Sequence, residues 1–108
     1  MASAEDFRRL ALGFKGTVAE PHVDRTAFRV VRTYATLAPD GLTANVKLML
    51  DEQHFKCLTA PDAIAPVASG WGKQGWTTLQ LAKLSEEEII DALKLAWLRG
   101  RLKKLPKI

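Results

Sequence analysis

The stretch TYATLAPDGLTANVKL, residues 33–48, decides the fold of this 108-residue chain. In its second half, apolar side chains occupy every other position: Leu42, Ala44, Val46 and Leu48. This period of two is typical of an antiparallel strand with one buried face and one face in water. Before the strand, Pro39 presets its own φ and Gly41 accepts a positive φ, a combination that predicts a turn. We therefore expect residues 33–38 and 42–50 to form two strands joined at this turn.

Four further segments have the composition of strands: residues 17–23, 26–31, 64–68 and 76–82. Pro21 interrupts the first of them, and because proline cannot donate to a strand ladder, that segment is expected at a sheet edge. The second stands directly before residues 33–38 and predicts a hairpin with that strand. The third is short and favours another edge strand. The fourth alternates clearly, with Thr77, Leu79 and Leu81 on one side.

Two long helices are predicted near the two ends of the chain. The first covers residues 3–13, where Ser3 and Asp6 have the spacing of a capping box. The second begins at Ser85 with the sequence SEEE, which combines a capping box with acidic side chains that the helix dipole favours. It is expected to end near Gly100. Each helix carries one apolar stripe, so each has one face to bury.

A shorter helix is predicted between the two long ones. Asp51 is expected to cap it and Pro61 to close it, while Phe55 and Leu58 are expected to face inward. Two long helices beside one antiparallel sheet give the fold class α+β. We expect a two-layer sandwich, one domain over residues 1–108, with the long helices on one face of the sheet and the other face open to water.

The charge of the chain is unevenly distributed. The net charge is +4, and five basic side chains fall within the last ten residues. Residues 1–98 hold 11 basic and 12 acidic side chains. The expected folded body is thus close to neutral, and residues 99–108 form a basic tail that attracts polyanions weakly.

The composition also bears on location. No run of 18 apolar residues exists, and the N-terminus lacks the apolar segment of a signal peptide. Cys57 is the only cysteine, which is typical of a reducing compartment. We expect a cytoplasmic monomer that does not associate with a membrane.

Five short sequences follow one another along the chain: FRV at residues 28–30, ATL at 35–37, KL at 47–48, GW at 75–76 and AW at 96–97. This ordered set resembles the MmcQ/YjbR-like family over roughly residues 5–105. The resemblance implies a CyaY-like (frataxin-like) α+β fold, in agreement with the sandwich expected from the periodicity. It also implies no established enzyme activity. Members of that family are commonly described as DNA-binding proteins with a double-wing arrangement.

The apolar strand positions that are expected to face the helices are Phe28, Val30, Leu37, Leu42, Ala44, Val46, Leu79 and Leu81. The opposite positions then form an open face: Arg29, Tyr34, Thr36, Asn45, Lys47, Trp76, Thr78 and Gln80. Aromatic rings, cations and amides together can stack bases and neutralise phosphates. An antiparallel sheet also exposes a polar face without any ligand, so both interpretations stay open here.

Residues 69–75, SGWGKQG, form a flexible, glycine-rich loop before the last strand. The spacing matches neither a P-loop nor a dinucleotide-binding motif. Lys73 and Gln74 at its tip are placed to touch a partner, as a wing would. Polar, glycine-rich loops also occur without any function.

Metal binding and catalysis have little support in the sequence. Iron binding of the frataxin type needs an acidic ridge, whereas the first helix has only Glu5 and Asp6. His22 and His54 are far apart in the sequence and lack clustered ligands. His22 has acidic neighbours, so an acid–base enzyme centred on it is a third hypothesis. Cys57 follows a lysine, but a small buried cysteine is the commoner case.

The sequence therefore predicts a small non-enzymatic binding protein. DNA is the most concrete ligand, and an unidentified protein or small molecule is the alternative. The expected nucleic-acid contacts are Arg29, Lys47, Lys73, Gln74, Trp76, Arg99, Arg101, Lys103 and Lys104. In this interpretation the cations hold phosphate and Trp76 supplies a stacking surface. No catalytic residue, cofactor or metal ligand is expected.

Overall fold

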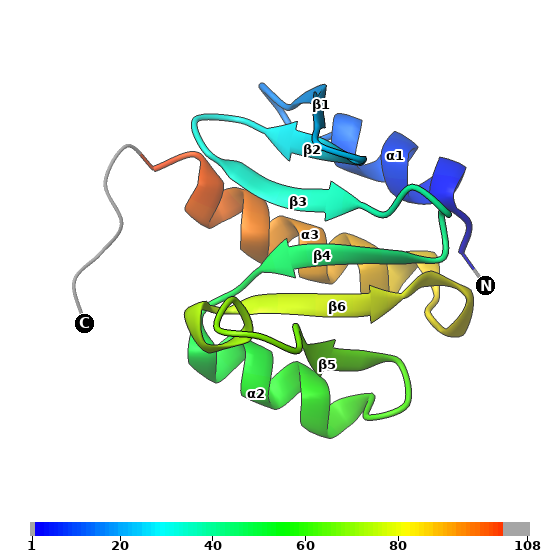
Figure 1. Ribbon diagram of the computed structural model, residues 1–108, viewed down its shortest axis with the longest axis vertical. Helices are drawn as coiled ribbons and strands as arrows, with labels where there is room; N and C mark the ends of the chain where they lie inside the picture. The colour runs from blue at the N-terminus through cyan, green and yellow to red at the C-terminus, as the bar shows by residue number, and fades with distance from the viewer. Residues whose placement is uncertain (1, 103–108) are drawn as a thin grey trace.

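A six-stranded antiparallel sheet forms one layer of the computed structural model, which describes residues 2–102 (Figure 1). Its strands, in spatial order, are β1 (Val18–His22), β2 (Arg25–Arg29), β3 (Thr33–Leu37), β4 (Thr43–Lys47), β6 (Trp76–Gln80) and β5 (Ile64–Pro66). The helices are α1 (Ala4–Leu12), α2 (Leu50–Thr59) and α3 (Glu86–Gly100), with short 3-10 helices η1 (Gly72–Gln74) and η2 (Leu81–Lys83). The expected strands, hairpin and edge positions are confirmed.

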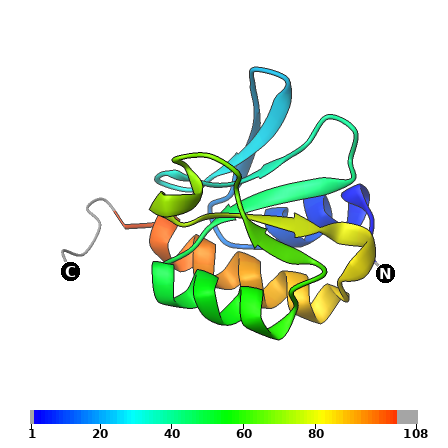
Figure 2. The ribbon, with the colours of Figure 1, turned by 60° about the horizontal axis from the view of Figure 1, so that its bottom comes forward.

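The three α-helices lie in one layer against a single face of the sheet (Figure 2). The two-layer α+β sandwich expected from the sequence is therefore confirmed. The prediction that the middle helix is shorter than both others was wrong, because α2 has 10 residues, one more than α1. The opposite face of the sheet carries no α-helix among the described residues, and we call it the open face, although Ala27 and Thr36 on it are buried.

The core lies between the sheet and α1 and α3. Fully buried side chains from the strands are Phe28, Ala44, Val46, Thr77 and Leu79, and those from the helices are Phe7, Ile89 and Leu93. The rings of Phe7 and Phe28 meet edge to face with centroids 5.7 Å apart, which ties α1 to β2. Both predicted capping boxes are present, at Ser3 with Asp6 and at Ser85 with Glu88. As expected, the side chains at alternate positions of β4 and β6 lie on the buried face of the sheet.

Tyr34 departs from the expected alternation. It was predicted on the open face, yet it is buried, and its hydroxyl donates to the backbone oxygen of Ala11 in α1. The cause is a register shift between β2 and β3: Phe28 pairs with Ala35, but Arg29 pairs with Thr33, so Tyr34 is left without a partner residue. A bulge of this kind re-aims the extra side chain, here toward the helices.

Two other inward predictions were wrong. Leu42 precedes β4 and is 67% exposed. The residue that precedes α2 is Met49 and not the predicted cap Asp51, so the helix starts at Leu50. Phe55 and Leu58, which were predicted to face inward, are exposed. Gln53 occupies the buried side of α2 instead, because its amide bonds the neighbouring loop. The hydrogen bond of Gln53, rather than the apolar side chains Phe55 and Leu58, therefore determines which side of α2 faces the protein.

The C-terminal region also differs from the prediction of a tail that starts at residue 99. Helix α3 includes Arg99 and Gly100, and Arg101 follows it as the cap. The end of the helix is held by the backbone, since the Arg32 N–H donates to the Gly100 oxygen at 2.8 Å. Gly100 also lies against Tyr34, where a Cβ would come within 2.8 Å of the tyrosine Cβ. This close approach fixes the position of Arg99.

Replacement of Gly75 by alanine tests the backbone constraint that positions η1. Gly75 has φ +104°, and a Cβ there would overlap the backbone oxygen of Leu48. We expect Gly75→Ala to lower the free energy of unfolding by about 2–4 kcal/mol in urea denaturation, from left-handed strain plus the overlap. Gly70→Ala is the matched control, because a methyl group at that position would meet no other atom within 4 Å, and it should change stability by less than about 0.5 kcal/mol. Equal losses in both variants would contradict this account.

Candidate functional site

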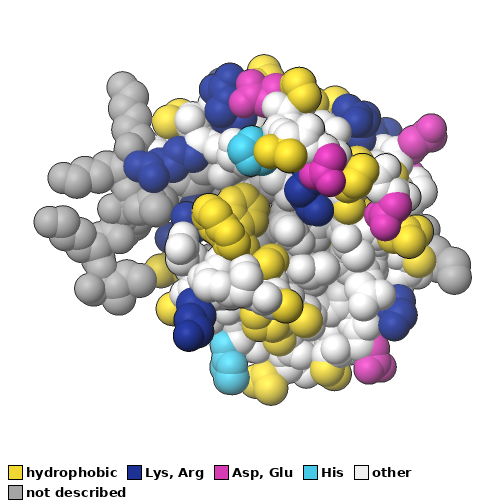
Figure 3. All heavy atoms as spheres, viewed as in Figure 1, with side chains coloured by type: hydrophobic (Ala, Val, Ile, Leu, Met, Phe, Trp, Pro, Cys, Tyr) yellow, Lys and Arg dark blue, Asp and Glu magenta, His cyan; other side chains and the backbone are white. Residues whose placement is uncertain are grey.

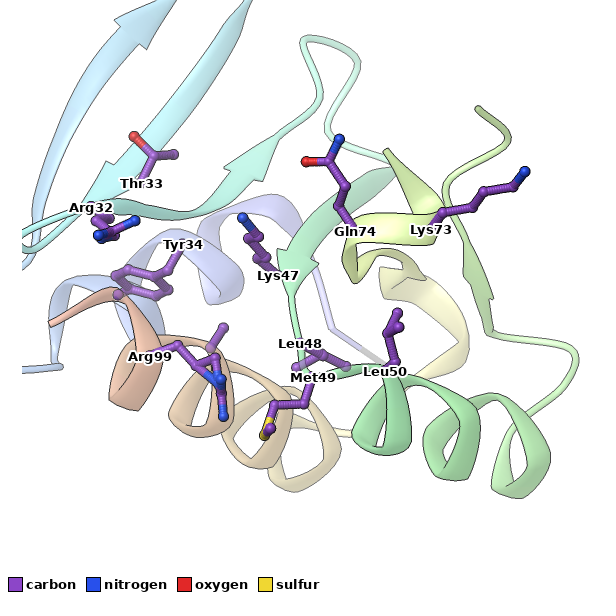
Figure 4. Close-up of a pocket in the computed structure, with 12 residues that line it drawn as sticks. Arg32, Thr33, Tyr34, Lys47, Leu48, Met49, Leu50, Lys73, Gln74 and Arg99 are labelled. Atoms are coloured by element: carbon purple, nitrogen blue, oxygen red, sulfur yellow. The ribbon is translucent and has the colours of Figure 1, made fainter. Parts of the chain in front are cut away.

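A cleft of about 420 Å³ lies where β4 passes into α2 (Figure 4). Its lining side chains come from the start of β3, the end of β4, η1 and the last turn of α3. Apolar groups of Tyr34, Leu48, Met49 and Ala96 form part of the wall. Four separate segments therefore converge on one hollow.

The lining of this cleft is strongly basic. Four cations border it: Arg32, Lys47, Lys73 and Arg99. No acidic side chain is among the described residues that line it. We call this hollow, defined by those four cations, the cationic cleft. Because the folded body is close to neutral overall, the gathering of four cations here is a local feature that favours an anion.

Arg99 lines the cationic cleft and has one nitrogen without a partner among the described residues. Its Nε is buried and has no hydrogen-bond partner. Leaving a buried donor unsatisfied costs about 1–3 kcal/mol, and more when the group is charged. An anionic oxygen in the cationic cleft is the kind of acceptor that would remove this cost.

The remaining cationic side chains differ in how they are held. Arg32 donates through Nε to the backbone oxygen of Leu102 at 3.2 Å. Lys47 is half-buried at the end of β4, whereas Lys73 is exposed and extends outward from η1 (Figure 4). Burial raises the pKa of the neighbouring Tyr34, only partly offset by its hydrogen bond to Thr17. The phenol in the wall therefore stays neutral at pH 7 and adds no negative charge.

A second hollow, of about 210 Å³, lies on the open face of the sheet. It is lined by His22, Arg25, Thr36, Asn45, Val67, Trp71 and Trp76, and we call it the aromatic pocket. Figure 3 views this face and shows hydrophobic side chains gathered near its centre, with basic side chains and a histidine around them. Trp71 is 59% exposed, so its ring is accessible to a ligand.

Arg25 is one of the residues that line the aromatic pocket. Its Nε donates to Thr36 Oγ1 at 2.9 Å, which fixes the guanidinium. Its Nη2 is buried and has no partner. Beside it, Asn45 Oδ1 accepts a hydrogen bond from Thr78 Oγ1 at 2.9 Å. The pocket therefore combines aromatic surface with a positioned donor that lacks an acceptor.

The two hollows adjoin each other. Lys47 of the cationic cleft and Trp76 of the aromatic pocket are direct partners in the β4–β6 register. Side chains at such directly opposed positions lie about 5 Å apart at Cβ. Helix η1 also borders both, with Trp71 before it and Gln74 at its end. A ligand longer than one small group can therefore occupy both hollows.

Gln53 of α2 holds η1 in place from below. Its Nε2 lies 3.0 Å from the Gly72 oxygen, 3.1 Å from the Trp76 oxygen and 3.1 Å from Thr77 Oγ1. Gln53 is buried, so these contacts replace water at a polar group inside the protein. The loop predicted as flexible from its glycines is thus anchored at both ends of η1.

The structure brings five of the predicted contacts together. Lys47, Lys73, Gln74 and Arg99 line the cationic cleft, and Trp76 lines the adjoining pocket.

The other predicted contacts lie elsewhere. Arg29 is at the β1–β2 edge, where its Nε pairs with Glu20 Oε1 at 2.9 Å. The Arg101 guanidinium lies over the Trp97 ring, 5.1 Å from its centre. Lys103 and Lys104 lie outside the described residues.

Sequence reasoning missed Arg25, Arg32 and Gln53 as members or supports of the site. Arg25 has the same strand parity as Arg29 and so was available from the alternation. Arg32 lies between the two strands that were predicted to form the hairpin, at residues 26–31 and 33–38. Nothing in the local pattern around Gln53 indicates its role, because its partners are 19 to 24 positions away.

Other chemistry considered from the sequence gains little from the structure. Burial raises the pKa of the Cys57 thiol, and the adjacent Lys56 is paired with Asp91, so the lysine does not serve to activate the thiol. Within residues 2–102, no group of three or more His, Cys, Asp or Glu side chains could hold a metal ion. In the same range, no helix is long and apolar enough to cross a membrane.

Comparison with known proteins supports the fold. No protein-family model and no curated protein matches the chain. The structure is similar to the crystal structure of the Deinococcus radiodurans protein DR2400, which carries the domain DUF419. The TM-score is 0.76 at 21% sequence identity, over 91% of this chain and 78% of that one. At this identity the likeness extends to the fold alone.

Replacement of Gln53 tests the anchoring of η1. We expect Gln53→Ala to lower the free energy of unfolding by about 1–3 kcal/mol, because buried acceptors lose their donor. Gln80→Ala is the control, since Gln80 is an exposed glutamine at the end of β6, and it should be neutral within about 0.5 kcal/mol. Urea denaturation measures both. A neutral Gln53→Ala would mean that α2 does not hold η1.

Proposed function

We propose that this protein binds single-stranded nucleic acid across the open face of its sheet, with phosphates held in the cationic cleft. The carrying observation is the convergence of four cations from four segments on one cleft without an acidic lining residue. A phosphodiester strand is the common biological ligand that offers repeated anions at short spacing. The arrangement serves binding and needs no catalytic group.

The form of the cationic cleft suits phosphate. The Arg99 guanidinium offers a buried Nε donor without an acceptor, and guanidinium groups bind phosphate oxygens well. Lys47 adds a half-buried ammonium on the adjacent strand. The apolar wall lowers the local dielectric, which strengthens the attraction between these cations and a bound anion.

A single strand fits this face better than a duplex. The major groove of a duplex admits an α-helix, but the tryptophans of the aromatic pocket lie on the face of the sheet opposite α1, α2 and α3. The open face instead presents an exposed Trp71 and a half-buried Trp76. Unpaired bases stack on such rings, and each stacked base contributes about 1–3 kcal/mol.

The resemblance in sequence agrees with this proposal. The ordered short sequences are similar to the MmcQ/YjbR-like family, and the fold is similar to a DUF419 protein. We propose that the chain is a member of the MmcQ/YjbR-like family and a cytoplasmic monomer. DNA binding, as that family is commonly described, is then the expected activity.

A specific observation also favours the alternative, a protein-interaction module. Helix α2 exposes three large apolar side chains: Leu50, Phe55 and Leu58. Exposed apolar surface of this kind is typical of a protein contact. It lies on α2 and outside the aromatic pocket, and of its three side chains Leu50 also lines the cationic cleft.

Fluorescence anisotropy with a labelled single strand of about 20 nucleotides tests the proposed function. We expect binding that weakens steeply from about 50 to 200 mM salt, in the full chain and in a chain ending at Leu102. Lys47→Ala and Arg99→Ala should each weaken binding and reduce the salt slope by about one, as expected for one lost phosphate contact. Lys94→Ala and Arg8→Ala are the controls, because both cations are exposed on helices outside the cleft.

Two results would contradict the proposal. If only the full chain binds, the basic residues after Leu102 act as a nonspecific polycation. If neither chain binds at the lowest salt, the exposed face of α2 becomes the better candidate, and the protein-interaction alternative is favoured.

A labelled duplex of the same sequence should bind more weakly than the single strand.

A further inference from the structure

We propose that the aromatic pocket holds one unstacked nucleobase and prefers a base with a carbonyl oxygen on its edge, guanine or thymine (uracil), over adenine. The inference rests on the proposed nucleic-acid binding and adds selectivity to it. It is carried by Arg25 Nη2, a buried donor without a partner in a pocket that also contains two tryptophans. Four features of the aromatic pocket support it: the size of the pocket, its aromatic rings, its hydrogen-bond donors and its position beside the cationic cleft.

The aromatic pocket has the size of a single flat group. Its volume of about 210 Å³ lies below the range of about 300–1,000 Å³ that is usual for drug-sized ligands. One base fits this scale, whereas a whole dinucleotide does not. A single-base pocket beside a phosphate cleft matches a strand that passes over both.

Trp71 and Trp76 supply surfaces for stacking. Trp71 is the most exposed aromatic ring next to the pocket, at 59%. It follows Gly70, where an added Cβ would meet no atom within 4 Å. Trp76 is fixed in β6 by its pairing with Lys47. One ring is thus free to adjust to a base while the other is held by the sheet.

The donor chemistry of the pocket selects the base edge. Thr36 Oγ1 accepts from Arg25 Nε at 2.9 Å, which orients the guanidinium and leaves Nη2 without an acceptor. Asn45 uses its Oδ1 to accept from Thr78, so its amide nitrogen is a second donor at the wall. No acidic side chain is among the described residues that line the pocket. A carbonyl oxygen has two lone pairs and can accept from both donors, whereas adenine presents one ring-nitrogen lone pair beside an amino group that would face the second donor.

The unsatisfied donors follow a pattern across the protein. Within residues 2–102, the buried side-chain nitrogen or oxygen atoms without a partner are Arg25 Nη2 and Arg99 Nε. Arg25 lines the aromatic pocket and Arg99 lines the cationic cleft. Buried polar groups in folded proteins are almost always paired with protein or with ordered water, so each of these two nitrogens is a place where water or a ligand oxygen would supply the acceptor.

The adjacency of the two hollows lets one nucleotide use both. Lys47 and Trp76 are directly opposed in the β4–β6 ladder. A base against Trp76 therefore places its own phosphate within reach of Lys47. Selectivity for the base and attraction for the backbone then act at neighbouring positions of one strand.

Competition binding with ten-nucleotide homopolymers tests the inference. Unlabelled dT10 and dA10 displace a labelled strand, and the ratio of their dissociation constants is followed by anisotropy. We expect dT10 to bind about tenfold more tightly, since a hydrogen bond from a charged, buried donor is stronger than one between neutral groups. Arg25→Met should bring the ratio close to one. Thr36→Val, which removes the acceptor for Arg25 Nε at nearly constant volume, should lower the ratio as well.

The contribution of stacking is read from a second series. Trp71→Ala should weaken dT10 binding about tenfold, whereas Trp71→Phe should retain most of the affinity because a ring remains. Trp97→Phe is the control, since Trp97 lies on α3 against Phe14, outside both hollows. Circular dichroism of each variant confirms that it is folded before its binding is compared.

The outcomes separate this inference from the proposed function. If dT10 and dA10 compete equally in the unchanged protein while Arg99→Ala weakens both, base selection by the aromatic pocket is wrong and nucleic-acid binding stands. If the preference for dT10 persists in Arg25→Met and in Thr36→Val, the guanidinium is not its source and the inference fails. If no strand binds at low salt, both fail together.

Discussion

The left-handed backbone at Gly75 is the constraint on which both hollows depend. It allows the chain to leave η1 and enter β6 directly beside the end of β4, where the Leu48 N–H donates to the Gly75 oxygen at 2.9 Å. A side chain at this position would overlap the Leu48 oxygen, so only glycine permits the approach. Because η1 then borders the cationic cleft on one side and follows Trp71 on the other, one backbone conformation places the walls of two sites.

The bulge that buries Tyr34 completes the other side of the cleft. With its ring directed toward the helices, Tyr34 meets α3 at Gly100, the position where a larger residue would collide with it. The last turn of α3 therefore comes close to β3, and Arg99 reaches the same hollow as Lys47. In a regular hairpin Tyr34 would lie on the open face, and Gly100 at the end of α3 would lack its contact with the tyrosine. Local irregularity in the sheet is thus what assembles the cationic cleft from distant segments.

The sequence was sufficient for the layers of the fold but not for these irregularities. Alternation in residues 42–48 and 76–81 predicted which face of β4 and β6 is buried, because a period of two is a property of the strand itself. The bulge at Tyr34 and the rotation of α2 about Gln53 depend on partners far away in the sequence, and no local pattern encodes them. For this reason Phe55 and Leu58 were placed on the wrong side of α2.

The candidate site shows the same division. Lys47 and Trp76 were predicted together because both follow from strand parity, and the register makes them direct neighbours. Arg99 was predicted as part of a basic tail, and only its position in α3 reveals that it lines a cleft. Arg25 has the strand parity of the open face, but only the structure shows that one of its nitrogens is buried without an acceptor. Composition and periodicity describe how much charge a chain carries, whereas the fold decides which charged side chains lie together in one hollow. Two such donors, each in its own hollow and each on an arginine, are an energetic cost to the free protein. In the proposed function, a strand offers a phosphate oxygen at the cationic cleft and a base carbonyl at the aromatic pocket, the two places where these arginines lie.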